Sequence, residues 1–338
     1  MSFAMISIVS YSDDAHADLV EKALQEGGFS DFVRLDLEQA HGSADLSITD
    51  HKWQIVTGHV KATVDSSNVT TVWWRRTGTR ATPTSEALIS EIDYTECYWA
   101  VRWLLESLPS SCFPFGHPNR LRAAENKLAQ LSVARAVGFR VPATCISNNK
   151  AILTAFALGH EWLVVKPFYA SVVRDEQGRE QSLYAAPVER QLLVNKLEES
   201  AEPVQLLCQE RIWKCRDVRV LFFPDGENFA CEIDASALPK AEVDWRPNTM
   251  AYPHSIISLP ATIQSKAAQY LARLGLTSGS FDFGITKDDE WVFFECNPNG
   301  QWLWMELKTG FELARKVASV LLNHHQNSLG RSLADQTQ

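Results

Sequence analysis

The clearest pattern of apolar and polar positions lies between residues 280 and 310. Two runs rich in Phe, Val, Ile and Trp flank the polar cluster Lys287-Asp288-Asp289-Glu290. Apolar runs on either side of a short polar turn predict a β-hairpin. The sequence Pro298-Asn299-Gly300 then ends the second strand, and a short Trp-rich segment follows.

Acidic side chains oppose one another in this predicted hairpin. If Asp288 and Asp289 are the two turn residues, Asp282 lies directly opposite Glu295, and Asn297 lies on the same face. Like charges in direct opposition destabilise a sheet, whereas two carboxylates and an amide oxygen form an oxygen ligand set for a divalent cation. We therefore predict a metal site there. On spacing alone, a solvated edge hairpin is the alternative.

The N-terminal part predicts a β-α-β unit. Residues 3–9 form an apolar run typical of a buried strand, residues 15–25 have the period of an amphipathic helix, and a second strand follows near residues 32–37. This order favours a small parallel sheet. It contains no Gly-x-Gly-x-x-Gly, so a dinucleotide site there has no support.

Two aromatic segments of this region are expected to pack. Val72-Trp73-Trp74-Arg75-Arg76 ends a strand, and its rings and arginine stems are expected to cover a domain edge, with a ligand role as the alternative. Residues 86–108 predict a long helix. Trp99 and Trp103 are four positions apart on it, and we expect them to face mainly the core.

Two lysines in the middle of the chain have different surroundings: Lys127 is typical of the solvated surface of a helix, whereas Lys166 is a candidate anion ligand. Residues 121–137 predict one helix that contains Lys127, and an apolar strand ends at Lys166, directly before Pro167. Burial of an ammonium group is unfavourable without an anionic partner, so Lys166 indicates a phosphate or a carboxylate nearby. A lysine that simply emerges at a strand end is the alternative. Residues 168–182 predict a mobile hairpin or lid.

Composition limits the function classes. A chain of 338 residues exceeds one typical core and favours two or three domains. Lys and Arg number 32 against 41 Asp and Glu, and this net charge of -9 argues against a general nucleic-acid partner. The seven cysteines form no Cys-x-x-Cys pair, which is typical of reduced thiols in a cytoplasmic protein. No apolar run is long enough for a membrane partner or an export signal.

The candidate polar positions follow one another in a characteristic order. They are, along the chain, Lys127, Lys166, the flexible loop, Gln209-Glu210-Arg211-Ile212, Asp217-x-Arg219, and Asp282 with Glu295-x-Asn297. This order resembles the ATP-grasp superfamily. In that superfamily, as in this chain, the first metal-binding Asp is followed thirteen residues later by Glu-x-Asn.

Shorter segments resemble a narrower group, the microviridin-type ligases. These graspetide macrocyclases close ester or amide rings between side chains of a ribosomal precursor peptide. The resembling segments are the opening strand, Val72-Trp73-Trp74-Arg75-Arg76, Glu125-Asn126-Lys127, and Asn297-Pro298-x-Gly300-Gln301-Trp302 through Glu306 to Thr309-Gly310.

The resemblance implies an architecture of α/β and α+β parts. In the ATP-grasp fold, ATP is clamped between two α+β subdomains that follow an N-terminal Rossmann-like pre-ATP-grasp domain. We expect the N-terminal domain at residues 1–120, and the central subdomain, with its lid and peptide-binding hairpin, at residues 121–205. The C-terminal subdomain with the Mg²⁺ site is expected at residues 206–330.

The resemblance also implies the cofactors ATP and Mg²⁺ and the residues that hold them. Lys127 and Lys166 would hold the phosphates. The backbone of Gln209-Glu210-Arg211-Ile212 would meet the adenine edge, with Glu210 as the side-chain contact, and Asp217 would touch the ribose. The residues expected to hold two Mg²⁺ ions between the β- and γ-phosphates are Asp282, Glu295 and Asn297.

Arg219, Arg246 and Lys166 are the catalytic candidates. An arginine fork matches both a carboxylate and an acyl phosphate. Many ATP-grasp ligases carry an Arg two residues before the first metal Asp, whereas this chain has Ser280. The positive charge must come from elsewhere, and the choice between Arg219 and Arg246 stays open. The candidates for a general base, each with ordinary surface or core as its alternative, are Glu189, Asp244 and His254.

The implied reaction is the ATP-dependent closure of rings in a peptide. The γ-phosphate passes to a side-chain carboxylate, and a hydroxyl or amine then attacks the acyl phosphate. Both steps build negative charge on oxygen, so positioned cations should provide most of the catalysis. The partner would be a precursor peptide whose leader docks as a helix, helped by a hairpin within residues 168–186; a solvated loop is the alternative.

Other readings of the sequence stay open. A ligase that adds an amino acid to a peptide or protein would share every ATP residue, and a non-catalytic nucleotide-binding protein is a further alternative. A homodimer is expected only by analogy with the family.

Overall fold

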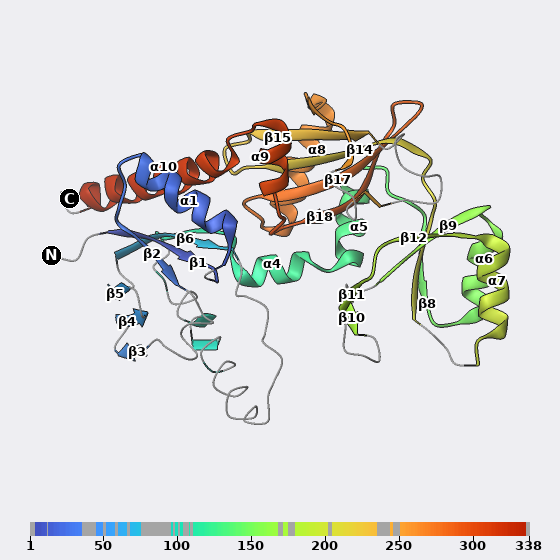
Figure 1. Cartoon of the computed structure of the whole chain (residues 1–338), viewed down its shortest axis with the longest axis horizontal. Helices are drawn as coiled ribbons and strands as arrows, with labels where there is room; N and C mark the ends of the chain where they lie inside the picture. The colour runs from blue at the N-terminus through green and yellow to red at the C-terminus, as the bar shows by residue number, and fades with distance from the viewer. Residues whose placement is uncertain are drawn as a thin grey trace.

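The chain forms an elongated molecule of several sheets. A computed structural model describes residues 4–11, 13–35, 45–49, 52–57, 60–65, 68–75, 96, 99–100, 102–103, 108, 111–167, 172–174, 180–201, 205–234, 244–245 and 251–335. A four-stranded parallel sheet lies at one end of the molecule, a four-stranded antiparallel sheet lies at the other end, and the five-stranded sheet lies between them (Figure 1).

The parallel sheet lies in the part of the chain where the N-terminal domain is expected, and we keep that name for it. Its four strands lie in the order β2-β1-β6-β7, and all three pairings are parallel. Their bounds are Met5–Val9 for β1, Phe32–Leu35 for β2, Val69–Trp74 for β6 and Phe113–Phe115 for β7. Helix α1 (Ala15–Glu26) connects β1 to β2. The predicted β-α-β unit with a parallel sheet is confirmed. An additional antiparallel sheet consists of β3 (Asp45–Thr49), β4 (Lys52–Thr57) and β5 (Val60–Asp65).

The two tryptophans expected in the core lie nearer the surface. Trp99 is 38% exposed and Trp103 is 64% exposed, whereas Arg102 between them is only 6% exposed. The prediction that both rings face mainly the core is therefore wrong. The rings lie 6.3 Å apart and cover one another, and the Arg102 guanidinium lies 5.2 Å from the Trp99 ring. Spacing alone gave the shared face of the helix but not the direction in which that face points.

Two helices replace the single helix predicted over residues 121–137. They are α4 (Pro118–Ala124) and α5 (Lys127–Ala136). The break occurs because the Asn126 side chain accepts hydrogen bonds from the backbone N–H groups of Leu128 and Ala129 and so begins a new helix. Lys127 thereby becomes the first residue of α5.

The sheet at the other end of the molecule belongs to the expected central subdomain, and we call it the central sheet. It is antiparallel, with the order β12-β9-β13-β8. Its strands are β8 (Thr144–Ser147), β9 (Trp162–Lys166), β12 (Ala186–Glu189) and β13 (Leu206–Glu210). Two helices belong to this region, α6 (Lys150–Leu158) and α7 (Arg190–Glu199). β13 begins at the boundary predicted between residues 205 and 206, yet it pairs with β8 and β9, so the central sheet extends past that boundary. A separate hairpin, β10 (Val172–Arg174) with β11 (Glu180–Ser182), lies within the predicted lid segment.

The C-terminal sheet has the order β16-β15-β14-β17-β18. Its strands are β14 (Lys214–Phe222), β15 (Asn228–Asp234), β16 (His254–Ile257), β17 (Gly279–Thr286) and β18 (Trp291–Asn297). Helix α8 (Ala261–Leu274) packs on one face of this sheet through Tyr270, whose ring lies 5.3 Å from that of Phe281. Two more helices follow, α9 (Leu303–Thr309) and α10 (Leu313–Asp335).

The predicted hairpin is β17 and β18, but its turn differs from the prediction. Asp282 lies opposite Glu295, as expected, whereas Phe283 lies opposite Phe293. The turn has three residues, and Asp289 has a positive φ of 58°. Phe294 is therefore an extra residue in β18, and this β-bulge restores the pairing that a two-residue turn would have given.

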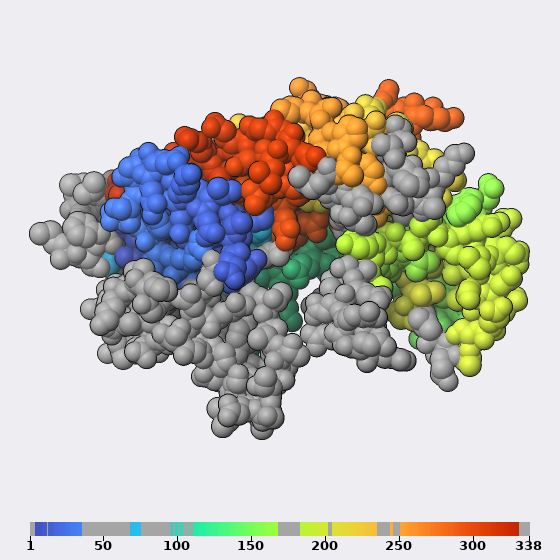
Figure 2. All heavy atoms as spheres, viewed as in Figure 1, coloured from blue at the N-terminus to red at the C-terminus, as the bar shows by residue number. Residues whose placement is uncertain are grey.

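The last helix belongs to the N-terminal domain in space. α10 packs against α1 and β6, and one core contains Ile8 and Val20 from the start of the chain with Val317 and Leu321 from its end. Figure 2 shows the red C-terminal surface beside the blue N-terminal surface. Among the described residues, no helix combines the length and apolar character needed to cross a membrane.

Candidate active site

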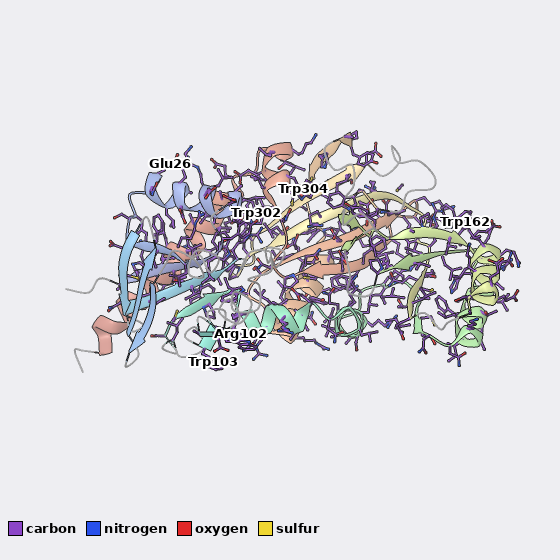
Figure 3. The ribbon with its side chains drawn as sticks, turned by 60° about the horizontal axis from the view of Figure 1, so that its bottom comes forward. Glu26, Arg102, Trp103, Trp162, Trp302 and Trp304 are labelled. Atoms are coloured by element: carbon purple, nitrogen blue, oxygen red, sulfur yellow. The ribbon has the colours of Figure 1, made fainter. Side chains whose placement is uncertain are left out.

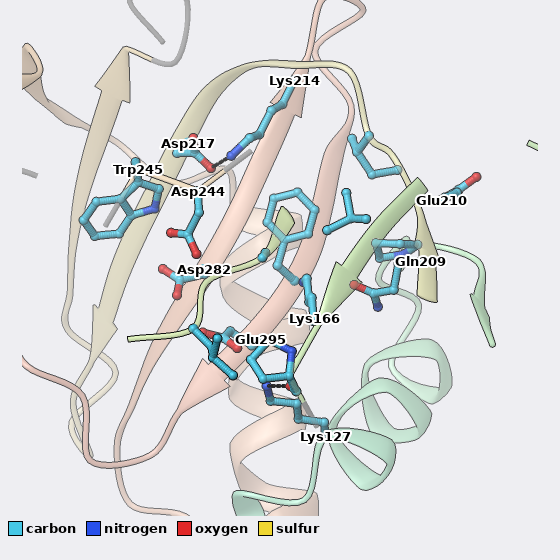
Figure 4. A pocket seen from close by; sticks show the side chains of 17 residues that line it. Lys127, Lys166, Gln209, Glu210, Lys214, Asp217, Asp244, Trp245, Asp282 and Glu295 are labelled. Carbon is cyan, nitrogen blue, oxygen red and sulfur yellow. Dashed lines mark hydrogen bonds and ion pairs between the residues drawn. The ribbon is translucent and has the colours of Figure 1, made fainter. Parts of the chain in front are cut away.

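A pocket lies between the central sheet and the C-terminal sheet. Apolar side chains line one part of it, including those of Val164, Leu183 and Ile212. Lysines and carboxylates line the rest, and Figure 4 shows them converging from β9, β14, β17, β18 and α5. This combination suits a ligand that has a flat apolar part and an anionic part.

The two predicted lysines lie in this pocket. The Lys127 Nζ donates a hydrogen bond to the backbone oxygen of Pro167 at 3.0 Å, which links the first residue of α5 to the end of β9. The Lys166 Nζ lies 5.4 Å from the centre of the Phe294 ring. Both ammonium groups thus lie at the lining of one cavity, although they are 39 residues apart in sequence.

A third lysine, Lys214, was missed by the sequence reasoning. It lines the same pocket, lies 5.5 Å from the Phe294 ring and forms an ion pair with the buried Asp217. The sequence could have indicated Lys214, because it lies three residues before the candidate Asp217. In the structure it is the first residue of β14. The predicted ribose ligand, Asp217, therefore already holds a cationic partner.

The predicted hinge lies only partly in the pocket. Gln209, Glu210 and Ile212 line it, and the Glu210 carboxylate accepts a hydrogen bond from the backbone N–H of Ala143 at 3.1 Å. In Figure 4 this carboxylate points away from Asp282 and Glu295. The Arg211 side chain is not part of the lining and lies between two rings, 4.1 Å from Trp213 and 5.2 Å from Trp162.

The three predicted metal ligands converge on one face. The Asn297 Nδ2 lies 3.4 Å from Asp282 Oδ2 and 3.3 Å from Glu295 Oε1. Glu295 follows the bulge residue Phe294, and both line the pocket, whereas Phe293 and Cys296 on either side are core residues. The bulge thus directs two consecutive side chains into the pocket.

The donor set fits a divalent cation that prefers oxygen ligands. Two carboxylates lie within hydrogen-bond range of one amide, and rotation of that amide by half a turn presents its oxygen instead. Within the described part of the chain, no three His, Cys, Asp or Glu side chains form a metal-binding group, and Asn297 is the candidate for a third side-chain ligand beside Asp282 and Glu295. Burial, together with the charges of Asp282 and Glu295, raises the pKa of the neighbouring Cys296 thiol well above its usual value.

Arg219 lies beside the first of these carboxylates. Its Nε lies 2.5 Å from Asp282 Oδ1 and its Nη2 lies 3.0 Å from Asp282 Oδ2, a bidentate pair. Its Nη1 donates to Ser280 Oγ at 3.1 Å, because β14 pairs with β17. The guanidinium therefore occupies the neighbourhood of Ser280, where many ATP-grasp ligases carry an Arg. Arg246, the other candidate, lies outside the described residues.

Aromatic rings cover the Arg219 guanidinium. Its central carbon lies 5.2 Å from the Trp245 ring and 6.0 Å from the Trp304 ring, and the two rings lie 4.9 Å apart. Figure 3 shows Trp304 and Trp302 in the middle of the molecule and Trp162 on the central subdomain. The sequence reasoning did not assign Trp245 to the site, although both of its neighbours, Asp244 and Arg246, were candidates.

The three candidates for a general base have different positions. Asp244 lines the pocket near Asp282 (Figure 4). Glu189 precedes α7 and is not part of the pocket lining. His254 contacts the backbone oxygen of Tyr252 through Nδ1, and burial lowers its pKa. Of the three, only Asp244 lies at the pocket.

Comparison with known proteins identifies the fold. No protein-family model and no curated protein sequence matches the chain. Among solved structures, the macrocyclase MdnC from Microcystis aeruginosa, bound with the precursor peptide MdnA, has a TM-score of 0.80 at 24% identity, over 94% of this chain and 99% of that chain. A RiPP-associated ATP-grasp ligase from Chryseobacterium gregarium, in complex with ADP and a leader and core peptide, has a TM-score of 0.82 at 22% identity, over 95% and 97%.

The chain has the ATP-grasp fold. A third structure, the ATP-grasp ligase PsnB complexed with a variant precursor, Mg and ADP, agrees at a TM-score of 0.71 and 16% identity, over 96% of this chain and 99% of that chain. The ATP-grasp fold predicted from the order of motifs is confirmed, and the pocket lies between the two sheets that form the clamp. The Rossmann-like description of the N-terminal domain stays a prediction.

Proposed function

We propose that this chain is an ATP-dependent ligase that closes ester or amide rings in a ribosomal precursor peptide. The observation that carries the proposal is one pocket lined by two lysines, Asp282 and Glu295, in which Arg219 and Asn297 contact these carboxylates from behind the lining. The ATP-grasp fold supports it, because similar structures at high coverage are macrocyclases or ligases bound with precursor peptides.

The proposed reaction has two steps. A carboxylate oxygen of an Asp or Glu side chain in the peptide attacks the γ-phosphorus of ATP, ADP leaves, and an acyl phosphate forms. A Thr or Ser hydroxyl, or a Lys amine, of the same peptide then attacks the acyl carbon, and inorganic phosphate leaves. The proton of the attacking group passes to a base, for which Asp244 is the candidate at the pocket.

The residues of the chain divide this work by charge. Lys127 and Lys166 would bind the phosphates of ATP, because they line the pocket with their ammonium groups. Asp282, Glu295 and Asn297 would hold Mg²⁺, which neutralises charge on the phosphates when bound. Arg219 would grip the reacting carboxylate or its acyl phosphate, since its planar fork already binds a carboxylate here.

The apolar part of the pocket would accept the adenine. Val164, Leu183 and Ile212 line it, and the predicted hinge residues Gln209 and Glu210 lie beside them. The backbone of this hinge would meet the adenine edge, and Asp217 the ribose. These assignments remain proposals about this chain.

The decisive experiment incubates the protein with ATP, Mg²⁺ and a peptide encoded beside its gene. A loss of about 18 Da per ring by mass spectrometry, with one ADP per ring, is the expected result. A gain of one amino-acid mass would instead support a ligase that adds an amino acid to a peptide or protein. Nucleotide binding without ADP formation would support a non-catalytic protein and would overturn the proposal.

We further propose how the peptide is recognised. The leader would dock as a helix on the central subdomain, and the β10–β11 hairpin would assist it. Deletion of residues 174–180 should abolish peptide modification while ADP affinity changes by no more than about threefold. Leader binding that survives this deletion would contradict the role of the hairpin. We also propose that the protein acts as a homodimer in the cytoplasm.

A further inference from the structure

Two buried side chains of the N-terminal domain contact the segment that joins β18 to α9, and a third links these two. We call residues 298–303 the connector. It begins directly after the proposed metal ligand Asn297 and ends at the start of α9. The contacting residues are His16, which is 8% exposed, and Arg75, which is 1% exposed, and the linking residue is Asp14, which is 1% exposed.

Arg75 holds the first half of the connector. Its Nη1 donates to the backbone oxygen of Asn299 at 3.2 Å and to Asn299 Oδ1 at 3.2 Å. The Asn299 Nδ2 donates in return to the backbone oxygen of Arg75. These reciprocal bonds fix Asn299, two residues after Asn297, against the end of β6.

His16 holds the second half of the connector. Its Nε2 lies 3.2 Å from the backbone nitrogens of both Trp302 and Leu303, at the start of α9, for which Trp302 supplies no side-chain cap. Two N–H donors require Nε2 to be an acceptor, so the ring proton resides on Nδ1. His16 thus caps a helix of another domain.

Asp14 sets this tautomer. Its Oδ1 lies 3.2 Å from His16 Nδ1 and accepts a hydrogen bond from the N–H group there. Its Oδ2 accepts a hydrogen bond from the Ser10 hydroxyl at 2.6 Å and lies 3.6 Å from Arg75 Nε. Burial would raise the pKa of Asp14, but the hydrogen bonds from His16 and Ser10 and the Arg75 charge lower it below its usual value. The carboxylate therefore stays charged and joins both holding residues into one network.

The connector leaves little room for movement between its two ends. A Cβ on Gly300 would lie 2.6 Å from Ser280 Cβ, so the backbone of the connector lies directly on β17. Asn297 precedes this contact, and Trp304, which covers Arg219, follows it on α9. A shift of the connector would therefore move a metal ligand and the aromatic cover of Arg219 together.

We propose that His16 and Arg75, joined by Asp14, are positioning residues that hold Asn297 and α9 in their working geometry. The N-terminal domain then takes part in metal binding without supplying a ligand. This inference rests on the proposed function, since it takes Asn297 as a ligand of Mg²⁺. Loss of supporting hydrogen bonds around a metal site typically weakens metal affinity 10- to 100-fold.

The test compares two replacements of His16 that differ in reach. The Gln side-chain amide extends to the place of Nε2 and can accept both N–H groups, whereas that of Asn extends only to the place of Nδ1. The measurement is ADP affinity by calorimetry, once with Mg²⁺ and once with a chelator. The ratio of the ADP affinity with Mg²⁺ to the ADP affinity in chelator reports how strongly the bound metal ion favours nucleotide binding.

We expect His16→Asn to lower this ratio about tenfold, and His16→Gln to keep it within about threefold of the wild type. ADP affinity in chelator should be the same for all three proteins. A matched control is His325→Asn, which removes another buried histidine, 5% exposed and bonded to Thr70, from the same domain. It should lower thermal stability and leave the ratio unchanged.

The outcomes separate this inference from the proposed function. If wild-type ADP affinity does not respond to Mg²⁺, the metal assignment itself fails. If the wild type responds and His16→Asn responds equally, the positioning role is wrong. If His16→Asn does not fold, Asn299→Ala, which removes only the side-chain part of the Arg75 contact, should lower the ratio, and an unchanged ratio there would overturn the inference.

Discussion

The proposed ligands come from several strands and one helix, so single side chains carry separable roles. Lys127 begins α5, Lys166 ends β9, Asp282 lies on β17 and Glu295 on β18. The carboxylates of Asp282 and Glu295 lie opposite one another on neighbouring strands, so their negative charges repel. A cation bound between them would remove that repulsion.

Replacement of Glu295 by Gln should therefore abolish turnover. The amide keeps the shape but removes the charge that holds Mg²⁺, and we expect kcat to fall by about 1000-fold or more. ADP formation measured by a coupled assay gives the result. Glu290→Gln, in the exposed turn of the same hairpin, is the control and should retain full activity. Comparable rates for Glu295→Gln and the wild type would refute the metal assignment.

The buried pair of Lys214 and Asp217 gives a prediction about stability. Their side chains are 9% and 3% exposed, so Lys214→Met leaves a carboxylate uncompensated and should destabilise the protein by about 3–5 kcal/mol. Urea unfolding measures this difference. Adding Asp217→Leu should recover most of it, and a double variant as unstable as the single one would show that the pair is not the cause.

The carboxylate of Asp14 predicts a pH dependence of stability. Its pKa in the folded protein lies below the usual value, against burial, because of His16, Ser10 and Arg75. A lowered carboxyl pKa stabilises the fold above the unfolded pKa of about 3.9, and the contribution is lost as pH falls below it. The difference in urea midpoint between wild type and Asp14→Asn should therefore be largest above about pH 5 and shrink below about pH 4. A difference that grows on acidification would contradict this origin.

At the scale of elements, the β17–β18 hairpin shows what the sequence could and could not predict. The facing of Asp282 and Glu295 was predicted from a two-residue turn, but the observed turn has three residues and the bulge at Phe294 compensates. Alternation fixes which side chains share a face only while a strand is regular. The bulge depends on packing of the whole sheet, for which no local residue pattern is diagnostic.

Helix α5 is a case in which the local signal existed. Asn126 is a favourable first cap, and its two hydrogen bonds separate α4 from α5. The ATP-grasp fold was predicted because the order of lysines, hinge and acids resembles that superfamily, and not from the spacing of these residues alone. The position of Lys214 and Trp245 depended on strand pairing and on a loop path that the sequence does not specify.

The bulge predicts opposite behaviour for two adjacent phenylalanines. Phe294 lies in the pocket beside Lys166 and Lys214, so Phe294→Ala should weaken ADP binding about tenfold with or without Mg²⁺. Phe293 is fully buried in the core, so Phe293→Ala should instead cost about 3–5 kcal/mol of stability. Calorimetry and urea unfolding of both variants measure the contrast. Equal effects on binding would show that the bulge does not separate their faces.

At the scale of the molecule, the N-terminal domain contacts the segment that adjoins the proposed active site. It receives α10 from the far end of the chain and contacts the connector through His16 and Arg75, which Asp14 joins. The two ends of the sequence therefore share one core. Disturbance of that core should reach the connector as well.

Leu321 tests the shared core. It is fully buried against residues of α1 and β1, so Leu321→Asp should place an unpaired charge there and make residues 4–35 susceptible to limited proteolysis. Leu329 on the same helix is 39% exposed, and Leu329→Asp should change stability by less than about 0.5 kcal/mol. Equal protease resistance of both variants would show that α10 does not complete this domain.

The place of α10 also bears on synthesis. A ribosome releases β1 and α1 well before α10, yet side chains of α10 cover Ile8 and Val20. Domains generally fold as units while the chain emerges, so the sheets between these elements can assemble while β1 still lacks its cover. β1 and α1 thus reach their native surroundings only after α10 has been made, and during that interval their apolar surface is available to chaperones.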